Sequence, residues 1–417
     1  METTLRLADW VLGRYDAVNR AIGVAYARLR RLPWWIQVGL VWLLSRLYTV
    51  AVFLVVARQQ GPNPWTTQRP GYLDYIAGWD AGWYRRIFES GYPAVLPRLG
   101  DGRVAPNEWA FLPVYPYLVK AVNLATGLPW AWAAPILSSL VSLVLCLLMY
   151  RLFRLRASAR NALFAVALFG LQPAAPVLQI GYAESLALLL IVAILLCLLR
   201  QRYLLALPLV LVLSLTRPVI VPVAFLLAVW TIGQVLFRRR TGVPTRHLVQ
   251  LAVLTVSAAA AAAIWPLTVE AVTGVDGAYF QVEYAWRGGG DFLPYELAAV
   301  VGRRLFGPWL GLLAPLIFAA AFTWIMLSRP VRRLGPVLWI WTGAIVGYVM
   351  AVAAPNTALP RQLLPAFPLL LALGLVSPSR AYRVVLLLGA AASQLLWVGW
   401  LWHWSGTGVF GRLEANP

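Results

Sequence analysis

Residues 36–57 read IQVGLVWLLSRLYTVAVFLVVA, a stretch in which Arg46 is the only charged side chain. A helix needs about 20 predominantly apolar residues to cross the hydrocarbon core of a bilayer, so this stretch predicts a membrane-spanning helix. An ionisable side chain at that depth is a functional candidate by default. The alternative for Arg46 is a structural ion pair inside the helix bundle, for which Glu184 is one conceivable partner.

Similar apolar runs recur along the whole chain. Hydrophobic residues make up 61% of the sequence and charged residues 12%, about half the usual charged share. Peptide groups inside a membrane must be satisfied within the chain, so the spans are predicted to be helical. The sequence thus predicts an all-α, polytopic integral membrane protein with about 11 transmembrane helices. The further spans are 131–153, 161–178, 183–200, 203–216, 219–237, 247–268, 307–327, 336–354, 363–377 and 384–404.

The formal charge of +20 is distributed unequally between the two sides of this layout. Residues 1–35 and every second link between spans carry 21 arginines and three carboxylates, whereas the opposite side carries 12 cations and 11 carboxylates. Such an asymmetry follows the positive-inside rule, so the basic charge sets topology and gives no reason to expect a nucleic-acid partner. The arginine-rich side is predicted to be cytoplasmic. The composition suggests the multi-pass plasma membrane protein of a bacterium.

The N-terminal residues 1–35 are predicted to form an amphipathic helix on the cytoplasmic leaflet, followed by a single membrane domain over residues 36–417. An ordinary packed helix is the alternative for the first segment. No removable signal peptide is expected, because charged residues are spread through this region without an apolar core. Cys146, Cys197, His247 and His403 are too scattered to suggest a disulfide or a zinc site, so no metal or other cofactor is expected.

Two long extracytoplasmic loops are predicted, at about 58–130 and 269–306. In the first, the apolar segment 111–126 is short and contains two prolines, so we interpret it as an interfacial helix; a full span, which would invert the later topology, is the alternative. The second loop contains Glu283, Arg287 and the triplet at 288–290. No strand precedes the triplet and no Gly-Lys-Ser/Thr follows it, so it is interpreted as a hinge, with a mobile lid as an extension, and not as a phosphate loop.

Chemistry-bearing residues cluster in four places. In the first loop, Trp79-Asp80-Ala81-Gly82-Trp83-Tyr84 surrounds a carboxylate with aromatic rings suited to the lipid–water boundary. An interfacial anchor helix that happens to carry an acid is the equal alternative. Breaks at 179–185 and 214–218 place Glu184 and Arg217 at span edges, where broken helices line cavities or simply turn the chain. Arg361 enters a span from outside, where it can grip a phosphate or act as a snorkelling anchor.

Taken in order, these segments resemble the PIG-V family of mannosyltransferases, in its bacterial branch, within the GT-C class of membrane glycosyltransferases. The resemblance runs through most of the chain and departs from the family at Phe111-Leu112-Pro113 and at Gln362, where aromatic residues are more usual. It is carried by Trp79-Asp80-Ala81 with Tyr84 and Gly91-Tyr92, Ala110-Phe111-Leu112-Pro113-Val114-Tyr115-Pro116, Tyr182-Ala183-Glu184-Ser185, Thr216-Arg217-Pro218 and Arg361-Gln362-Leu363-Leu364-Pro365.

The resemblance implies a transferase that takes a sugar, usually mannose, from a polyprenyl-phosphate donor to a lipid or glycan acceptor on the extracytoplasmic face. Asp80 would be the general base, and Arg361 and Arg217 would bind the donor phosphate. A single displacement predicts inversion, whereas a retaining route needs a second carboxylate, for which Glu89, Glu108 and Glu184 are candidates. The expected substrate-binding residues are Trp79, Trp83, Tyr84, Trp109, Tyr115, Tyr182, Glu184 and Gln362.

Two other functions remain open at this point. Arg46, Glu184 and Arg217 within or beside spans suit a transporter or flippase of a lipid-linked sugar, although the internal repeats of transporters are missing from the sequence. A scaffold subunit with an inactive transferase fold has the same sequence features. Nucleotide-sugar enzymes are disfavoured, because the predicted cytoplasmic face carries no Asp-x-Asp motif.

Overall fold

The computed structural model describes residues 31–288, 294–353 and 358–404. Most of the predicted N-terminal amphipathic helix lies outside the described residues, as do Gly289, Gly290 and Asp291 of the predicted hinge.

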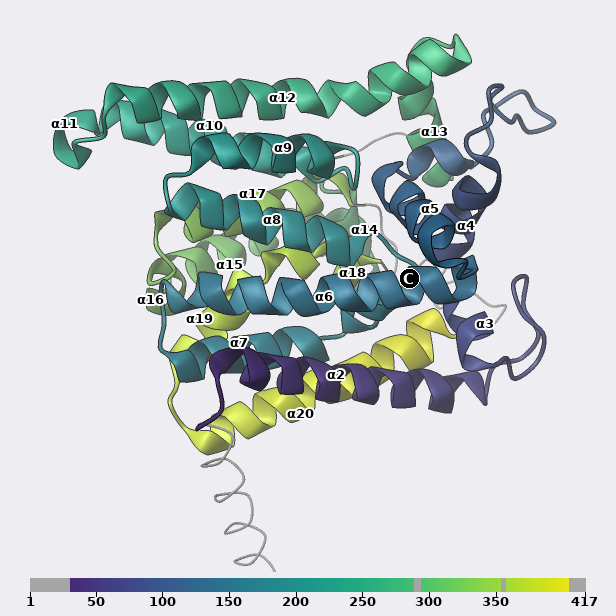
Figure 1. Cartoon of the computed structure of the whole chain (residues 1–417), viewed down its shortest axis with the longest axis horizontal. Coiled ribbons are helices and arrows are strands. Elements are labelled where there is room, and N and C mark those ends of the chain that lie inside the picture. Colours follow the sequence, from purple (N-terminus) through teal and green to yellow (C-terminus); the bar gives the residue numbers. More distant parts are fainter. Residues whose placement is uncertain (1–30, 289–293, 354–357, 405–417) are drawn as a thin grey trace, which may run out of the picture.

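The body of the molecule is a bundle of apolar helices that run roughly parallel to one another (Figure 1). Neighbours in the bundle include α2 with α7, α6 with α8, and α10 with both α12 and α17. The helices of the bundle are α2 (Trp34–Ala57), α6 (Trp130–Arg154), α7 (Ala159–Leu171), α8 (Glu184–Leu199), α9 (Tyr203–Ser214), α10 (Ile220–Leu236), α12 (Thr245–Thr273), α17 (Pro336–Val352), α19 (Pro368–Val376) and α20 (Arg380–Trp397).

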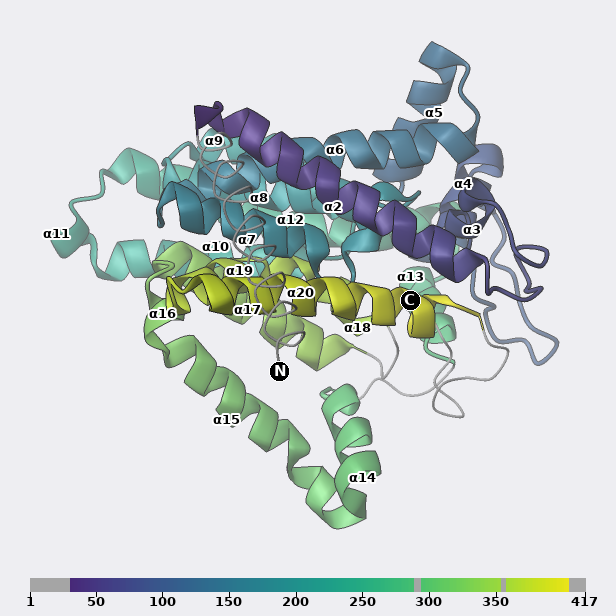
Figure 2. The same cartoon turned by 90° about the horizontal axis from the view of Figure 1, so that it is seen from below.

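A helical hairpin, α14 (Glu296–Leu310), η3 (Gly311–Leu313) and α15 (Ala314–Leu327), projects from the side of this bundle (Figure 2). Each of the eleven predicted spans coincides with an apolar helix of the described residues. Five helices of the described residues are long and apolar enough to cross a membrane alone, and the other apolar helices have 10–17 residues. The fold class is therefore confirmed, while the number of spans stays a prediction.

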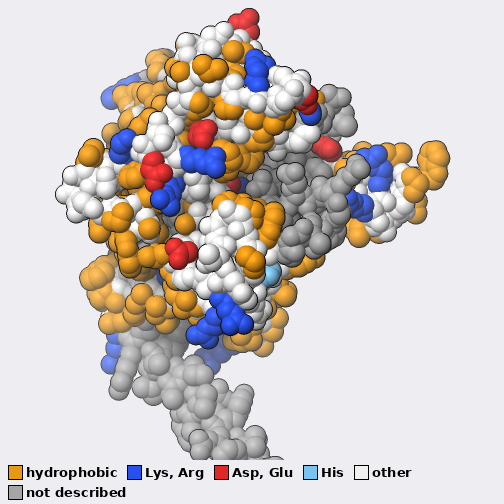
Figure 3. Space-filling view, turned by 90° about the vertical axis from the view of Figure 1, so that its right-hand side faces the viewer, with side chains coloured by type: hydrophobic (Ala, Val, Ile, Leu, Met, Phe, Trp, Pro, Cys, Tyr) orange, Lys and Arg blue, Asp and Glu red, His pale blue; other side chains and the backbone are white. Residues whose placement is uncertain are grey.

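Short helices gather at the two ends of the bundle. One end, which we call the loop end, carries most of the two predicted long loops, and its surface mixes acidic and basic side chains among apolar ones (Figure 3). The opposite end carries α11 (Arg238–Thr241) and α16 (Arg329–Arg332), in line with the predicted charge asymmetry. The elements near the loop end are α3 (Tyr72–Ile76), α4 (Asp80–Ser90), η1 (Glu108–Ala110), α5 (Val114–Thr126), η2 (Ala175–Gln179), α13 (Ala278–Trp286), α18 (Leu359–Gln362), η4 (Leu364–Ala366) and η5 (Val398–Trp402).

The second predicted loop is more ordered than its sequence suggests. α12 continues to Thr273 and ends at Gly274, which adopts the left-handed conformation common after a helix C-terminus. α13 and most of α14 then occupy residues that were expected to be loop. α5 lies at the loop end against α4 and α6, and its interfacial position stays a prediction.

Arg46 is held by backbone contacts in the bundle, and Glu184, considered as one conceivable partner, does not pair with it. Its guanidinium donates to the carbonyl oxygens of Gly170 and Ala175, each at 2.8 Å. Those carbonyls lie where α7 ends and η2 follows, so Arg46 satisfies backbone acceptors that a broken helix leaves open. Glu184 pairs with other arginines.

Candidate functional site

Four charged side chains from distant segments meet near the loop end and form what we call the charged cluster. Arg361 of α18 ion-pairs with Asp80, the first residue of α4. The Arg361 Nε atom also lies 3.5 Å from Oε1 of Glu184, the first residue of α8. Arg217, in the link between α9 and α10, places Nη1 at 3.2 Å from the same Glu184 oxygen.

Acids and arginines alternate through the cluster, so its formal charge is zero. Asp80, Glu184 and Arg361 are only 6%, 5% and 9% exposed. Charges removed from water need partners of opposite sign, which is why two acids and Arg361 can be buried here beside Arg217, whose side chain is 19% exposed. Both Glu184 carboxylate oxygens nevertheless lack a hydrogen bond, which leaves them able to accept one from a ligand.

The backbone at Trp79 sets the position of Asp80. Trp79 adopts φ 58° and ψ −133°, a region that L-residues other than glycine rarely occupy. Its indole N–H donates to the Trp402 carbonyl at 3.3 Å, and its ring packs against Trp65 and Trp404. The turn at Trp79 places Asp80 in the first turn of α4, where a helix favours negative charge.

Tyr182 joins the two halves of the ion pair. Its hydroxyl accepts a hydrogen bond of 3.2 Å from the Asp80 backbone N–H, and its ring lies 5.3 Å from the Arg361 guanidinium carbon. Tyr182 is fully buried. The break at 179–185 therefore supplies Glu184 to the charged cluster and places Tyr182 beside it.

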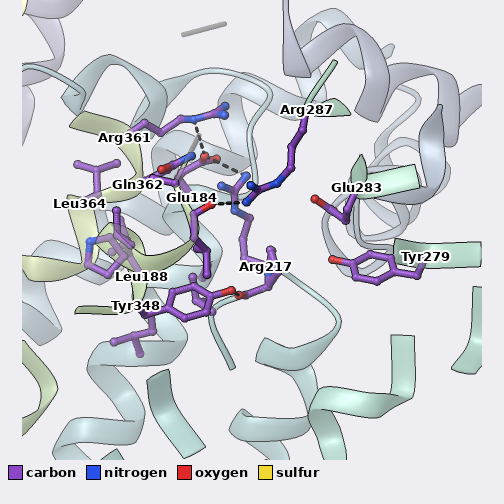
Figure 4. Close-up of a pocket in the computed structure, with 18 of the residues that line it drawn as sticks. Glu184, Leu188, Arg217, Tyr279, Glu283, Arg287, Tyr348, Arg361, Gln362 and Leu364 are labelled. Carbon is purple, nitrogen blue, oxygen red and sulfur yellow. Dashed lines mark hydrogen bonds and ion pairs between the residues drawn. The ribbon is translucent and has the colours of Figure 1, made fainter. Parts of the chain in front are cut away.

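A cavity of about 580 Å³ opens beside the cluster. Glu184, Arg217, Arg361 and Gln362 line it (Figure 4), whereas Asp80 is absent from the lining in the described part of the chain and reaches the site through its ion pair with Arg361. The apolar part of the wall is made by Ala187, Leu188 and Ile191 of α8 and by Val349 and Val352 of α17. The volume lies in the range of small-molecule sites.

The remaining aromatic residues expected to bind substrate pack around the site. Tyr84 contacts Phe111 and Tyr115 and lies near Arg217, while the Tyr115 hydroxyl is bonded to Ser138 at 2.8 Å. Trp83 stacks on Phe111, Trp109 stacks on Tyr92, and Trp79 is engaged as described above. None of these five predicted residues lines the cavity in the described chain, and their substrate-binding roles stay predictions.

The cavity also has a wall that the sequence interpretation did not assign. Tyr279 and Glu283 of α13 line the cavity across from the cluster, and Arg287, just beyond α13, extends toward Arg217 (Figure 4). Tyr348 of α17 also lines the cavity. Tyr279, Glu283 and Arg287 follow one another at intervals of four positions, and such spacing places side chains on one face of a helix. That spacing was visible in the sequence and was the available signal.

The other candidates lie away from this site. Glu89 pairs with Arg85 at 2.7 Å on the surface, and Glu108 lies 3.8 Å from Arg86. Of the three carboxylates considered for a retaining route, Glu184 is the one that lines the cavity. Within the described ranges, no group of three or more His, Cys, Asp or Glu side chains could hold a metal ion.

Comparison with solved structures gives the fold a class. The crystal structure of ArnT from Cupriavidus metallidurans bound to undecaprenyl phosphate matches with a TM-score of 0.50 and 18% sequence identity. The match covers 84% of this chain and 62% of the ArnT chain, so the chain spans under two thirds of that protein's length. ArnT is a GT-C glycosyltransferase. What the chain shares with it is the fold.

Two further matches have lower TM-scores. The apo crystal structure of the same ArnT has a TM-score of 0.46 at 17% identity, covering 83% of this chain and 62% of the other. The Archaeoglobus fulgidus oligosaccharyltransferase, crystallised with Zn and sulfate, has a TM-score of 0.46 at 14% identity, covering 86% and 53%. No protein-family model and no curated protein sequence matches this chain.

Proposed function

We propose that this protein is a membrane glycosyltransferase that transfers a sugar, most specifically mannose, from a polyprenyl-phosphate carrier to a hydroxyl of a lipid or glycan acceptor on the extracytoplasmic face. The observation that carries the proposal is the charged cluster beside an apolar-walled cavity at the loop end of a GT-C fold. Mannose as the sugar rests on the sequence resemblance to the PIG-V family.

The cavity has the two kinds of surface that a polyprenyl-phosphate donor needs. Arg217 and Arg361 present guanidinium groups, which bind phosphate oxygens by paired, charge-assisted hydrogen bonds. The apolar wall formed by α8 and α17 suits the hydrocarbon chain of the carrier. As the bond between the sugar and the phosphate breaks, the phosphate gains negative charge that the arginines stabilise.

In the proposed reaction, the acceptor oxygen attacks the anomeric carbon while Asp80 takes the acceptor's proton, and the carrier phosphate leaves with the bonding electron pair. One displacement inverts the anomeric carbon. Because Asp80 is ion-paired with Arg361, a donor phosphate that competes for the Arg361 guanidinium would loosen this ion pair and free the carboxylate for the acceptor. Arg361 therefore couples donor binding to the base.

The transporter hypothesis loses one of its supports. Arg46 is engaged by the backbone carbonyls of Gly170 and Ala175 and does not line the described cavity. Movement of a labelled lipid-linked sugar across a vesicle membrane, without chemical change, would favour a flippase. Turnover by the purified protein with donor and acceptor excludes an inactive scaffold.

The decisive experiment compares Asp80→Asn with the wild type, using undecaprenyl phosphate mannose as donor and a bacterial lipid extract as acceptor. We expect transfer to fall at least about 100-fold, because general base catalysis contributes that much or more. Donor binding should be retained or strengthened, because the donor phosphate no longer competes with a carboxylate for the Arg361 guanidinium, and thermal unfolding in detergent shows whether the variant is folded. Asp101→Asn, on an exposed loop, is the matched control.

Full transfer activity by the Asp80→Asn variant would remove Asp80 as the base. Absence of transfer by the wild type, despite a folded protein and bound donor, would contradict the proposed activity itself.

A further inference from the structure

The wall of the cavity formed by α13 carries polar side chains beside Phe280, and these polar side chains face the arginines. Glu283 and Tyr279 direct their oxygen atoms toward the side of the cavity that Arg217 and Arg287 occupy (Figure 4). Tyr348 contributes a hydroxyl from α17 to the same region, and that hydroxyl donates to the Pro218 carbonyl at 3.1 Å. The α13 wall and Tyr348 of α17 together thus offer one carboxylate and two phenol oxygens around a space that a ligand can enter.

Glu283 is held in this wall without full access to water. Burial raises the pKa of the Glu283 carboxyl, against the lowering effects of a hydrogen bond with Tyr279 and of the charges of Arg287 and Arg217. A carboxyl group that is desolvated by burial, and that lies beside two arginines on a cavity wall, is a candidate for ligand binding. The proposed catalytic sequence gives it no role.

The parts of a polyprenyl-phosphate sugar can be assigned to the cavity by their chemistry. The phosphate requires the cations, and the hydrocarbon chain requires the apolar wall of α8 and α17. The sugar is bonded directly to the phosphate, so it must lie next to the arginines. The polar side chains of α13 lie next to the arginines in the described cavity. Neither the phosphate nor the hydrocarbon chain of the donor has been assigned to them. A carboxylate accepts hydrogen bonds only, which matches the hydroxyl donors of a sugar ring.

We infer that Glu283 and Tyr279 form the subsite that binds the hydroxyl groups of the donor's sugar. The inference rests on the proposed function, because it assumes that a polyprenyl-phosphate sugar is the donor. Glu283 is then a specificity-determining residue, which distinguishes a sugar-bearing carrier from the bare carrier phosphate.

The test measures equilibrium binding of two labelled lipids, undecaprenyl phosphate mannose and undecaprenyl phosphate, to the purified full-length protein in detergent. Glu283→Gln should weaken binding of the mannose-bearing lipid at least about fivefold, as expected for the loss of a hydrogen bond to a charged acceptor. Binding of undecaprenyl phosphate should not weaken, which also shows that the cavity is folded. Tyr279→Phe should also weaken binding of the mannose-bearing lipid. Glu89→Gln, on the exposed surface of α4, should change the binding of neither lipid.

The alternative, in which Glu283 acts only as a nearby negative charge, gives a different result. Neutralising that charge would then strengthen binding of both lipids, because both carry a phosphate. Equal changes for the two lipids, in either direction, or no change for the mannose-bearing lipid would overturn the sugar subsite. If the wild type binds neither lipid, the proposed function fails as well, and this outcome is distinct from the others.

Monodeoxy analogues of the mannose-bearing lipid, one for each ring hydroxyl, identify the hydroxyl that Glu283 binds. For one analogue, wild type and Glu283→Gln should bind with affinities within about twofold of each other, since the hydrogen bond is already absent. If every analogue keeps the full difference between the two proteins, no single hydroxyl is bound by Glu283 and the inference is overturned.

Discussion

Trp79 adopts a backbone conformation that tryptophan rarely takes, directly before the carboxylate of the charged cluster. A residue in such a region costs about 1–3 kcal/mol and persists only where its surroundings impose it. Here the surroundings are the rings of Trp65 and Trp404 and the carbonyl of Trp402. The strain is local to the turn that places Asp80 at the start of α4. The fold thus accepts an unfavourable backbone conformation at Trp79 in order to position the Asp80 carboxylate.

The raised pKa of Glu283 predicts how the stability of the folded protein depends on pH. Because its pKa is raised by burial, the folded protein keeps a proton there over a range in which the unfolded chain has lost it. Stability therefore declines as the pH rises from the ordinary pKa of a glutamate to the raised one, and stays lower above that range. Glu283→Gln removes this contribution.

We expect Glu283→Gln to raise the melting temperature, measured in detergent, at about pH 8 and to raise it less at about pH 5. Glu89→Gln serves as the exposed control. A variant that is less stable than the wild type at high pH would show that the carboxylate supports the fold through its contacts.

The sequence could identify single residues of the site but not their pairing. Asp80, Glu184, Arg217 and Arg361 stood out because charges at span edges are rare and because their motifs resemble a known family. Which acid meets which arginine depends on how four distant segments fold together, and no local pattern encodes that. The partners of Arg46 were missed for a related reason, since backbone carbonyls have no signature in the sequence.

At the scale of whole elements, the contact between α2 and α7 shows how closely the bundle is packed. A Cβ atom on Gly170 of α7 would lie 2.6 Å from the Ser45 Oγ and 2.8 Å from the Ser45 Cβ, and the Gly170 carbonyl is one of the Arg46 acceptors. Only a residue without a side chain allows α2 and α7 to approach this closely. The same contact holds Arg46 in place.

Gly170→Ala should therefore destabilise the protein by about 1–3 kcal/mol, the usual range for overpacking a core. The matched control is Gly39→Ala in α2, where a Cβ atom would meet nothing within 4 Å and alanine favours the helix. Thermal unfolding of both variants in the same detergent measures the difference. Equal effects at the two positions would show that α2 and α7 separate without loss.

The helices themselves were well predicted, because membrane spans leave a strong hydropathy signal. Their ends were not: α12 and α14 extend into the predicted second loop, where capping at Gly274 and the kink at Gly307 decide the boundaries. Hydropathy reports which residues suit lipid and does not report where a helix stops.

At the scale of the whole molecule, the candidate site and the arginine-bearing helices α11 and α16 lie at different ends of the bundle. If the positive-inside rule sets the orientation, the cavity opens toward the extracytoplasmic side. A carrier lipid can then keep its hydrocarbon chain in the membrane along α8 and α17 while its phosphate meets Arg217 and Arg361.

The neutral charge balance of the cluster has a consequence for turnover. A loaded carrier arrives as a phosphodiester with one negative charge, but it departs as a monoester whose second ionisation lies near about pH 6. If Arg217 and Arg361 bind the carrier phosphate as proposed, their contacts with the phosphate of the spent lipid should be stronger than those with the phosphate of the substrate, and release of the spent lipid should then limit the rate. We expect added undecaprenyl phosphate to inhibit competitively against the donor, with an inhibition constant below the donor's KM, in steady-state assays at neutral pH. Inhibition weaker than the donor's KM would contradict this. Under such product inhibition, the turnover rate of the enzyme would follow the rate at which the cell removes the empty carrier from the membrane.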